Sequence, residues 1–286
     1  MIVVTGATGN VGRALVDQLL AEAAPVRALS RHPERAGLPA QAETVRARFG
    51  EGEPLEPLLD GADALFLNPA AASGDAAAGL IDAAAKSGVR RIVLLSSASI
   101  TDTPDDEQHF ISRMHLGIER AIRDSGLEWT FVRGGMFATN TLQWAEQIRH
   151  GDVVRGPYAD AVAAPVHEKD LAAVAAAALL DRVGAHDGAV YVVTGPEGLT
   201  TAEQVAAVGR AVGRDLRYEE LPRDAALQAM SERQGIPREV AESLLDYFAA
   251  TVGRPAHISH DVERVVGRTA LTYTQWAADH AADFTA

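Results

Sequence analysis

The stretch Met1 to Leu15 reads MIVVTGATGNVGRAL and combines three signals. Ile2 to Val4 is a short apolar run that predicts a buried parallel strand. Glycines follow at positions 6, 9 and 12, and the helical spacing of Val11, Leu15 and Leu19 begins at once. A strand, a glycine turn and a helix in this order are the context that a dinucleotide-binding turn requires.

Each glycine in this turn has its own expected task. Gly6 allows a tight turn with positive φ, Gly9 lets the backbone approach a pyrophosphate, and Gly12 lets the helix pack against the strand. The helix N-terminus then offers N–H groups to phosphates. The alternative is a strand-to-helix turn without a ligand. The predicted cofactor contacts here are Thr5, Gly6, Thr8, Gly9, Asn10, Val11 and Gly12.

A second strand, Val26 to Leu29, ends at Ser30 and Arg31, with Arg35 close behind. The adenosine ribose is expected roughly 20 residues past the glycines, where an NAD enzyme carries Asp or Glu. An arginine instead offers planar donors to a 2′-phosphate. Ser30, Arg31 and Arg35 therefore predict NADP(H) over NAD(H), the alternative being that Arg31 is a solvated loop charge.

Apolar runs and helical patterns alternate through the first half of the chain. Further strands are predicted at 45–49, 63–68, 91–95 and 128–133, with helices at 76–87 and 110–125. This pattern is typical of an α/β fold, a Rossmann-type doubly wound parallel sheet. Ligands lie at the carboxyl ends of such strands. Asn68, Pro69, Ser96 and Ser97 follow two of those ends, which adds Asn68, Pro69 and Ser96 to the cofactor contacts.

Composition excludes several classes of function. The 286 residues carry a formal net charge of −13, which argues against a nucleic-acid partner. The chain has no cysteine, so thiolate catalysis and Cys-ligated metals are excluded, and its histidines show no metal-ligand spacing. No signal peptide or membrane span is expected, and the expected location is the cytoplasm.

The second half predicts a smaller lobe. We expect an NADP-binding Rossmann core of residues 1–133 plus 162–194, and a C-terminal substrate-binding lobe of residues 134–161 plus 195–286, with a small-molecule substrate between them. Helices are expected at 140–150 and 171–180, the latter capped by Asp170. Thr200 to Glu203 fits a capping box. A monomer and a homodimer both remain open.

Several motifs together resemble the NmrA-like branch of the atypical short-chain dehydrogenase/reductases. They are TGATGNVG at the start, SRHP after the second strand, IVLLSS on the fifth, and SGLEWTFVRGGMFATN around the sixth. This resemblance implies a nucleotide-binding fold over nearly the whole chain. It also implies one of two functions, because the branch holds NADPH-dependent reductases of quinones, azo compounds and other conjugated acceptors, and catalytically silent nucleotide-sensing regulators.

Ordinary members of that superfamily carry a Tyr-x-x-x-Lys pair, and extended members add a Glu four residues later. Matching that Glu to Glu119 places His115 at the Lys position and Ile111 at the Tyr position. The resemblance makes His115 and Ser97 the catalytic candidates, with His115 bonding the nicotinamide ribose or donating a proton near neutral pH. Gly135 would contact the cofactor, and Met136, Phe137 and Asn140 the substrate.

The missing Tyr bears on the substrate. Reduction of an isolated ketone gives an alkoxide whose conjugate acid is about as weak as water, so it needs a positioned acid. Reduction of a quinone-type acceptor gives a phenolate-like anion with a conjugate pKa of about 10. We therefore expect an NADPH-dependent oxidoreductase acting on a small quinone-, azo- or enone-like acceptor. The alternative is a catalytically silent NADP(H)-sensing regulator of the NmrA type. A third possibility, an isomerase or dehydratase, is supported by no residue of the sequence.

Overall fold

The computed structural model describes residues 1–233 and 235–285. The chain divides into two compact units. Unit 1 comprises residues 1–134, 168–193 and 261–268, and unit 2 comprises 135–167, 194–260 and 269–286. These units differ from the predicted division at residues 134 and 261–268, which belong to unit 1, and at residues 162–167 and 194, which belong to unit 2.

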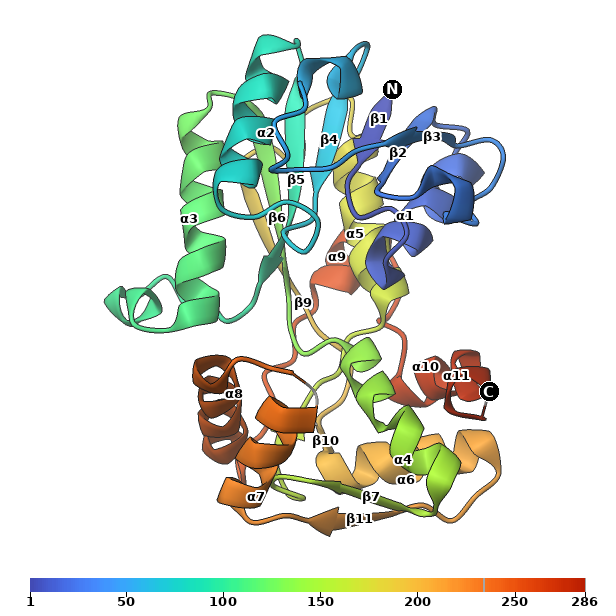
Figure 1. Ribbon diagram of the computed structural model, residues 1–286. Helices are drawn as coiled ribbons and strands as arrows, with labels where there is room; N and C mark the ends of the chain where they lie inside the picture. The colour runs from blue at the N-terminus through green and yellow to red at the C-terminus, as the bar shows by residue number, and fades with distance from the viewer. Residues whose placement is uncertain (234, 286) are drawn as a thin grey trace. The chain divides into compact units, whose positions relative to one another are not determined.

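Unit 1 is built on a seven-stranded sheet with the order β3-β2-β1-β4-β5-β6-β9 (Figure 1). All of its neighbouring strands are parallel. The strands are β1 (Ile2–Val4), β2 (Val26–Ser30), β3 (Glu43–Arg46), β4 (Ala64–Leu67), β5 (Arg91–Ser97), β6 (Glu128–Gly134) and β9 (Ala189–Val193). The strand order reverses beside β1, between β2 and β4, which confirms the predicted doubly wound parallel sheet.

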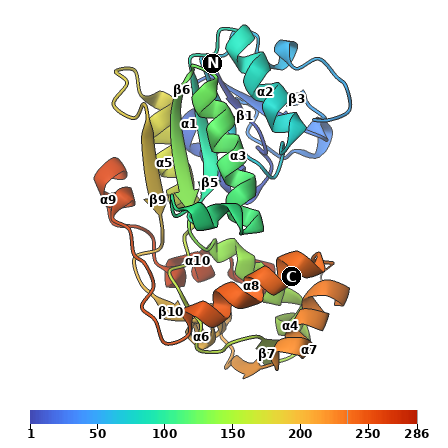
Figure 2. The same cartoon turned by 90° about the vertical axis from the view of Figure 1, so that its left-hand side faces the viewer.

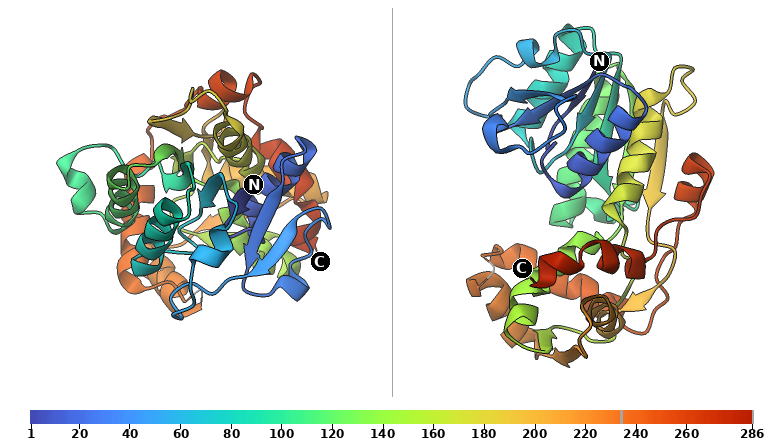
Figure 3. Two further views of the ribbon diagram at one scale, coloured as in Figure 1. Left: turned by 90° about the horizontal axis from the view of Figure 1, so that it is seen from above. Right: turned by 90° about the vertical axis from the view of Figure 1, so that its right-hand side faces the viewer.

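Helices cover both faces of this sheet. They are α1 (Asn10–Ala21), α2 (Asp75–Lys86), α3 (Phe110–Asp124), α5 (Glu168–Leu180) and α9 (Asp261–Val266), with 3₁₀ turns η1 (Pro33–Arg35), η2 (Glu56–Leu59) and η3 (Pro104–Glu107). Helices α2 and α3 lie side by side on one face, where Figure 2 shows α3 running along β5 and β6. On the other face α1 and α5 pack together, in blue and yellow in the right-hand view of Figure 3.

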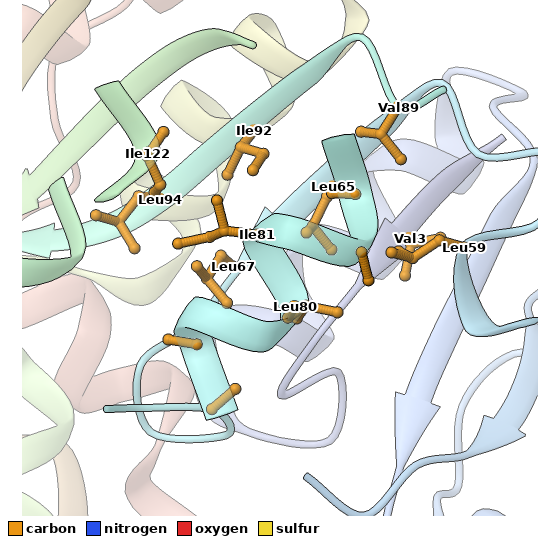
Figure 4. Packing of buried hydrophobic residues seen from close by; sticks show 14 of the residues in the cluster. Val3, Leu59, Leu65, Leu67, Leu80, Ile81, Val89, Ile92, Leu94 and Ile122 are labelled. Carbon is orange, nitrogen blue, oxygen red and sulfur yellow. The ribbon is translucent and has the colours of Figure 1, made fainter. Parts of the chain in front are cut away.

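The core between the sheet and α2 explains why the strands are so apolar. Leu65 of β4 and Ile92 of β5 pack with Leu80 and Ile81 of α2 in one buried cluster (Figure 4). The alternate strand positions, such as Phe66, point to the opposite face and are fully buried as well. Because both faces are covered by helices, the strands read as continuous apolar runs and not as alternating ones.

Helix α5 begins earlier than expected. It starts at Glu168, so Asp170 lies inside its first turn and is not the predicted cap. Asp170 is fully buried, and its carboxylate is 2.6 Å from the Arg268 guanidinium. The apolar pattern starts only at Leu171, so the predicted start of the helix is three residues too late.

Strand β9 forms one edge of the sheet, and a side chain covers part of that edge. The Asp261 carboxylate, at the start of α9, accepts a hydrogen bond from the Val192 backbone N–H at 2.8 Å. An edge strand normally presents such N–H groups to any chain that can pair with them. Asp261, 69 positions away in the sequence, therefore occupies the Val192 N–H group at this edge.

Unit 2 has its own small core. Its elements are η4 (Ala138–Trp144), α4 (Ala145–His150), β7 (Val153–Gly156), β8 (Val162–Ala163), β10 (Leu199–Thr200), α6 (Thr201–Val212), β11 (Arg217–Glu220), α7 (Arg223–Gln228), a π-helical turn (Ala229–Arg233), α8 (Arg238–Thr251), α10 (Tyr273–Asp279) and α11 (Ala281–Thr285). Trp276 is fully buried against Ile148 and Val208 in one cluster. Strand β11 pairs in parallel with β7, and β10 pairs antiparallel with β8.

The sequence predicted parts of this unit well and missed others. The capping box at Thr200 is present and opens α6, which ends at Gly213 in the left-handed conformation. The predicted helix 140–150 begins at Ala138 instead, and its first seven residues are 3₁₀. Strands β7, β8 and β10 were not predicted, because two to four residues carry no readable periodicity.

Candidate functional site

The glycine turn between β1 and α1 is closed by a very tight approach of helix to strand. Gly6 has a φ of 62°, which L side chains rarely adopt. Its carbonyl accepts the Gly9 N–H at 3.0 Å. A Cβ placed on Gly12 would collide with the Gly6 carbonyl oxygen. The structure therefore requires glycine at two of the three predicted positions, for backbone conformation and for packing.

The first turn of α1 suits an anion. Thr8, Gly9 and Asn10 are exposed, whereas Val11 and Gly12 are buried. Within the described residues, no side chain caps this helix and its first turn holds no acidic residue. Its leading N–H groups and the positive end of its dipole are therefore available to a phosphate. These residues fit the pyrophosphate of a dinucleotide.

Thr5 is a structural member of the turn. Its buried hydroxyl donates to the Phe66 carbonyl at 3.0 Å and accepts the Asn68 N–H at 2.8 Å. The Asn68 side chain accepts from the Ala70 N–H at 3.0 Å, and its amide nitrogen would lie 2.7 Å from a Cβ on Gly6. The ends of β1 and β4 are thus fixed together, with Asn68 held against the turn and Pro69 half-buried beside it.

Two exposed arginines, Arg31 and Arg35, follow the end of β2. Ser30 is buried, and its hydroxyl accepts the His32 N–H at 3.1 Å. Arg31 and Arg35 are exposed, and among the described residues neither guanidinium makes a hydrogen bond or ion pair. The nearby Glu34 is paired instead with His32 and with Arg46, at 3.4 and 3.3 Å. Both arginines are therefore free to meet a phosphate.

Arg13, which the sequence analysis did not single out, fixes this loop. Its guanidinium donates to the Gly37 carbonyl at 2.7 Å and to the Ala36 carbonyl at 2.9 Å. Arg13 lies in the first turn of α1, so it links that helix to the segment that carries Arg31. The sequence shows an arginine after the third glycine but gives no sign of this long-range contact.

The two serines at the end of β5 have different surroundings. Ser96 is buried, and its hydroxyl donates to Glu119 Oε1 of α3 at 2.6 Å. Ser97 is half-buried, and its hydroxyl donates to Ser99 Oγ at 2.9 Å. Ser96 was predicted as a cofactor contact, and its hydroxyl is bonded to the Glu119 carboxylate; a contact between Ser96 and the cofactor stays a prediction. Ser97 is the last residue of β5 and therefore lies at the carboxyl end of the strand.

His115 lies on the face of α3 that meets the end of β5. Ser112 Oγ, one turn earlier, donates to the Ser99 carbonyl at 2.8 Å, and Glu119, one turn later, accepts from Ser96. Residues three and four apart on a helix share a face. His115 therefore lies near the carboxyl end of β5, where Ser97 also lies.

One hydrogen bond sets the chemistry of His115. Its Nδ1 is 2.9 Å from the Ile111 carbonyl oxygen. A carbonyl can only accept, so Nδ1 carries the proton and Nε2 of the neutral ring is an acceptor. Burial lowers the pKa of His115, which favours the neutral ring near pH 7. Of the two expected roles, this geometry fits bonding a hydroxyl group and not donating a proton.

The remaining predicted site residues belong to unit 2 and are Gly135, Met136, Phe137 and Asn140. The Met136 carbonyl accepts the Val166 N–H at 2.8 Å, and Phe137 pairs with Val166 as an isolated bridge. Phe137 is half-buried and Asn140 is exposed at the start of η4. Gly135 directly follows β6 in the chain. Their roles toward cofactor and substrate stay predictions.

Two expected absences can be compared with the described part of the chain. Across residues 1–233 and 235–285, no group of three or more His, Cys, Asp or Glu side chains could hold a metal ion. Within the same residues, every helix is too short or too polar to cross a membrane.

Comparison with known proteins identifies the family. A profile described as NAD(P)H-binding matches residues 6–182. The chain belongs to this NAD(P)H-binding family. The (4-alkanoyl-5-oxo-2,5-dihydrofuran-3-yl)methyl phosphate reductase of Streptomyces griseus is 43% identical over 289 residues, which cover 99% of each chain. The NAD(P)H azoreductase of Xenophilus azovorans is 33% identical, again over 99% of each chain.

A solved structure shares the fold of this NAD(P)H-binding protein. The NADPH-dependent quinone oxidoreductase of Escherichia coli, complexed with NADPH, superposes with a TM-score of 0.79 at 25% identity, covering 98% of this chain and 99% of that one. These matches confirm the NmrA-like resemblance and the Rossmann-type fold. The chain is an NAD(P)H-dependent oxidoreductase, and the regulator alternative is not favoured.

Proposed function

We propose that the protein is an NADPH-dependent reductase of a small conjugated acceptor of the quinone, azo or enone type. The observation that carries this proposal is the Ile111–His115 pair on α3. The expected Tyr is replaced by Ile111, and the His115 ring presents an acceptor nitrogen because its Nδ1 proton is bonded to the Ile111 carbonyl. Neither residue donates a proton to a product oxygen at neutral pH.

The residues that would hold NADPH come from unit 1, apart from Gly135, which belongs to unit 2. The Gly6 to Gly12 turn and the first N–H groups of α1 would bind the pyrophosphate. Arg31 and Arg35 would bind the 2′-phosphate, and Asn68, Pro69 and Ser97 would border the nicotinamide half. When bound, NADPH supplies the hydride that reduces the acceptor. His115 Nε2 would accept a hydrogen bond from a ribose hydroxyl.

The chemistry of the acceptor follows from what these side chains lack. Without a positioned acid, the reduced product must be stable as an anion long enough to take its proton from water. A phenolate-like product, with a conjugate pKa of about 10, meets this condition, whereas an alkoxide does not. The side chains then serve to position the acceptor beside the nicotinamide, which is a large part of catalysis in such sites.

The names of the relatives support this acceptor class. An oxo-dihydrofuran with an alkanoyl group contains a ring double bond conjugated with carbonyl groups. Azo compounds and quinones, named in two further relatives, are conjugated acceptors as well. The predicted small-molecule substrate would be bound by the C-terminal lobe through Met136, Phe137 and Asn140.

Two further expectations belong to this proposal. The net charge of −13 supports the absence of a nucleic-acid partner. An enzyme that consumes NADPH works where that cofactor is supplied, which supports a cytoplasmic location.

The decisive experiment is a turnover assay. The purified protein is mixed with NADPH and a panel of quinones, azo dyes, enones and unconjugated ketones, and the absorbance of NADPH is followed. We expect turnover of conjugated acceptors and none of unconjugated ketones. Tight NADPH binding without turnover of any acceptor would instead support the NmrA-type regulator.

Cofactor preference has a separate test in Arg31→Asp. Charged hydrogen bonds are worth about 1.5–3 kcal/mol, so this change should weaken NADPH binding at least tenfold and leave NADH binding within about twofold. Isothermal titration with each nucleotide measures both constants without turnover. Arg48→Asp, at an arginine whose side chain is 40% exposed and pairs with Glu51, is the matched control. Equal losses for NADPH and NADH would show that Arg31 does not meet the 2′-phosphate.

A further inference from the structure

A buried ion network lies directly beneath the ends of β5 and β6. Arg133, the penultimate residue of β6, and Glu119 of α3 are both almost completely buried. Arg133 donates from Nε to Glu119 Oε1 at 3.0 Å and from Nη2 to Glu119 Oε2 at 2.8 Å. Replacing such a pair by apolar side chains often leaves stability unchanged or higher. The pair therefore calls for an explanation beyond stability.

The Glu119 carboxylate fixes α3 against the sheet. Besides Arg133, it accepts the Ser96 hydroxyl at 2.6 Å, and Ser96 is the register partner of Arg133 between β5 and β6. One carboxylate is thus bonded to both strands at their carboxyl ends. This arrangement sets the rotation of α3 about its axis and its height along the strands, and His115 lies one turn away on the same helix.

The other side of Arg133 holds the loop that follows β5. Its Nη1 and Nη2 donate to the two carboxylate oxygens of Asp102 at 2.6 and 2.9 Å. Asp102 has a φ of 59° although it is not glycine, and its side chain is 63% exposed. The hydrogen bond from Arg133 holds the pKa of Asp102 below its ordinary value. The loop therefore keeps a strained backbone and a charged contact together.

The geometry points to Arg133 as a positioning residue for the reductase reaction. Its planar guanidinium bridges Glu119 on α3 and Asp102 on the loop after β5. It thereby fixes His115 of α3 and Ser97 of β5 relative to each other at the carboxyl ends of the strands. This inference rests on the proposed function, because it concerns where those two side chains stand during reduction. A lysine cannot replace Arg133, since only a guanidinium donates to two carboxylates in one plane.

The test uses Asp102→Asn, because Arg133 and Glu119 are buried and their replacement risks misfolding. Asp105→Asn is the matched control, since Asp105 lies in the neighbouring turn η3 and its carboxylate accepts from the Gln108 side chain at 3.2 Å. Kinetics with NADPH and 1,4-naphthoquinone give kcat and KM, and calorimetry gives the Kd for NADPH. The His115 Cε1–H signal in NMR spectra, assigned with His115→Gln, reports on the ring directly.

We expect Asp102→Asn to lower kcat about tenfold, since small displacements of positioned groups have large effects. KM, NADPH Kd and the melting temperature should stay close to wild type, the His115 signal should move, and Asp105→Asn should change nothing. An unchanged kcat with an unmoved His115 signal overturns the inference. So does a parallel loss of kcat, NADPH binding and melting temperature, which would indicate a merely structural role. If the wild type reduces no acceptor, the proposed function fails, and the His115 signal still decides the positioning role.

Discussion

At the scale of single residues, hydrogen bonds decide which of several plausible roles a side chain can fill. The sequence indicates His115 as a site residue by its place in a motif, and it allows both a donor and an acceptor role. The bond from Nδ1 to the Ile111 carbonyl favours the acceptor role for Nε2. Thr5 is a similar case, because both hydrogen-bonding directions of its hydroxyl are used within the protein. Such partners cannot be predicted from residue types.

The pH dependence of the reaction tests the role of His115. Burial lowers its pKa below 6.5, so the ring is neutral at pH 7 and Nε2 accepts. As the pH falls through that lowered pKa, the ring gains a proton and Nε2 loses its lone pair. We expect kcat/KM to fall on the acidic side, and this limb should vanish in His115→Phe, whose rate at pH 7 should be about fivefold lower for one lost hydrogen bond. A rate that rises with acidity would identify His115 as a proton donor.

Alanine substitutions at two glycines should change the free energy of unfolding in opposite directions. In Gly12→Ala, the new Cβ would collide with the Gly6 carbonyl, so the helix must move. We expect a loss of about 1–3 kcal/mol in the free energy of unfolding, together with much weaker NADPH binding. Gly117 lies on the exposed side of α3, where an added Cβ would meet no atom within 4 Å. Gly117→Ala should therefore stabilise by about 0.5–1 kcal/mol.

Urea unfolding and NADPH titration of both variants check this pair. If Gly12→Ala binds NADPH as the wild type does, the close approach of α1 to the strand end is not needed for the cofactor.

At the scale of elements, most strands and helices of unit 1 could be predicted, because the strands are continuous apolar runs with polar or glycine ends and the helices between them have a helical period. The glycine turn, the order of strands and helices, and the polar strand ends all followed from local pattern. What could not be predicted depends on partners distant in sequence. Arg133 ends an apolar strand and reads as an ordinary boundary, yet it bonds carboxylates 14 and 31 positions away. The start of α5 was misplaced because its apolar pattern begins only at Leu171, three residues after the helix starts.

The opposite ends of the strands hold a second buried arginine. Arg91, at the start of β5, is fully buried, donates to Glu128 at 2.7 Å and lies 3.4 Å from Asp181. Arg91→Ala would leave buried acceptors unpaired, so we expect a loss of about 3–5 kcal/mol. Its neighbour Arg90 pairs with the same Glu128 but is 36% exposed, and Arg90→Ala should cost about 1 kcal/mol or less.

Chemical denaturation measures both changes, and NADPH titration provides the control. Because Arg91 lies at the amino ends of the strands, the folded variant should bind NADPH normally. Similar losses for Arg90→Ala and Arg91→Ala would show that burial does not set their importance.

At the scale of the whole molecule, each compact unit is assembled from three separate segments of the chain. The sequence predicted a return of the chain to the core around residues 162–194 but not the second return at 261–268. That last segment is short, and no apolar pattern distinguishes it. The roles of the two parts, cofactor core and substrate lobe, remain our prediction.

A truncation after residue 260 tests this interleaving. It removes α9 from unit 1 and also removes Trp276, which is fully buried in the core of unit 2. We expect a markedly lower melting temperature and weaker NADPH binding, although the glycine turn is intact. Trp276→Ala is the comparison, with an expected loss of about 3–5 kcal/mol. Normal NADPH binding by the truncated chain would show that unit 1 does not need its third segment.

The contact between Asp261 and the Val192 N–H has a consequence for how molecules of this protein meet one another. A second chain that extended the sheet along β9 would have to displace a carboxylate from that strand, and its own backbone carbonyl would face the negative charge. Growth of the sheet from molecule to molecule is therefore opposed at β9 by a side chain that folding itself brings into place. Protection of the β9 edge against pairing with another chain is therefore tied to correct placement of the last segment of unit 1.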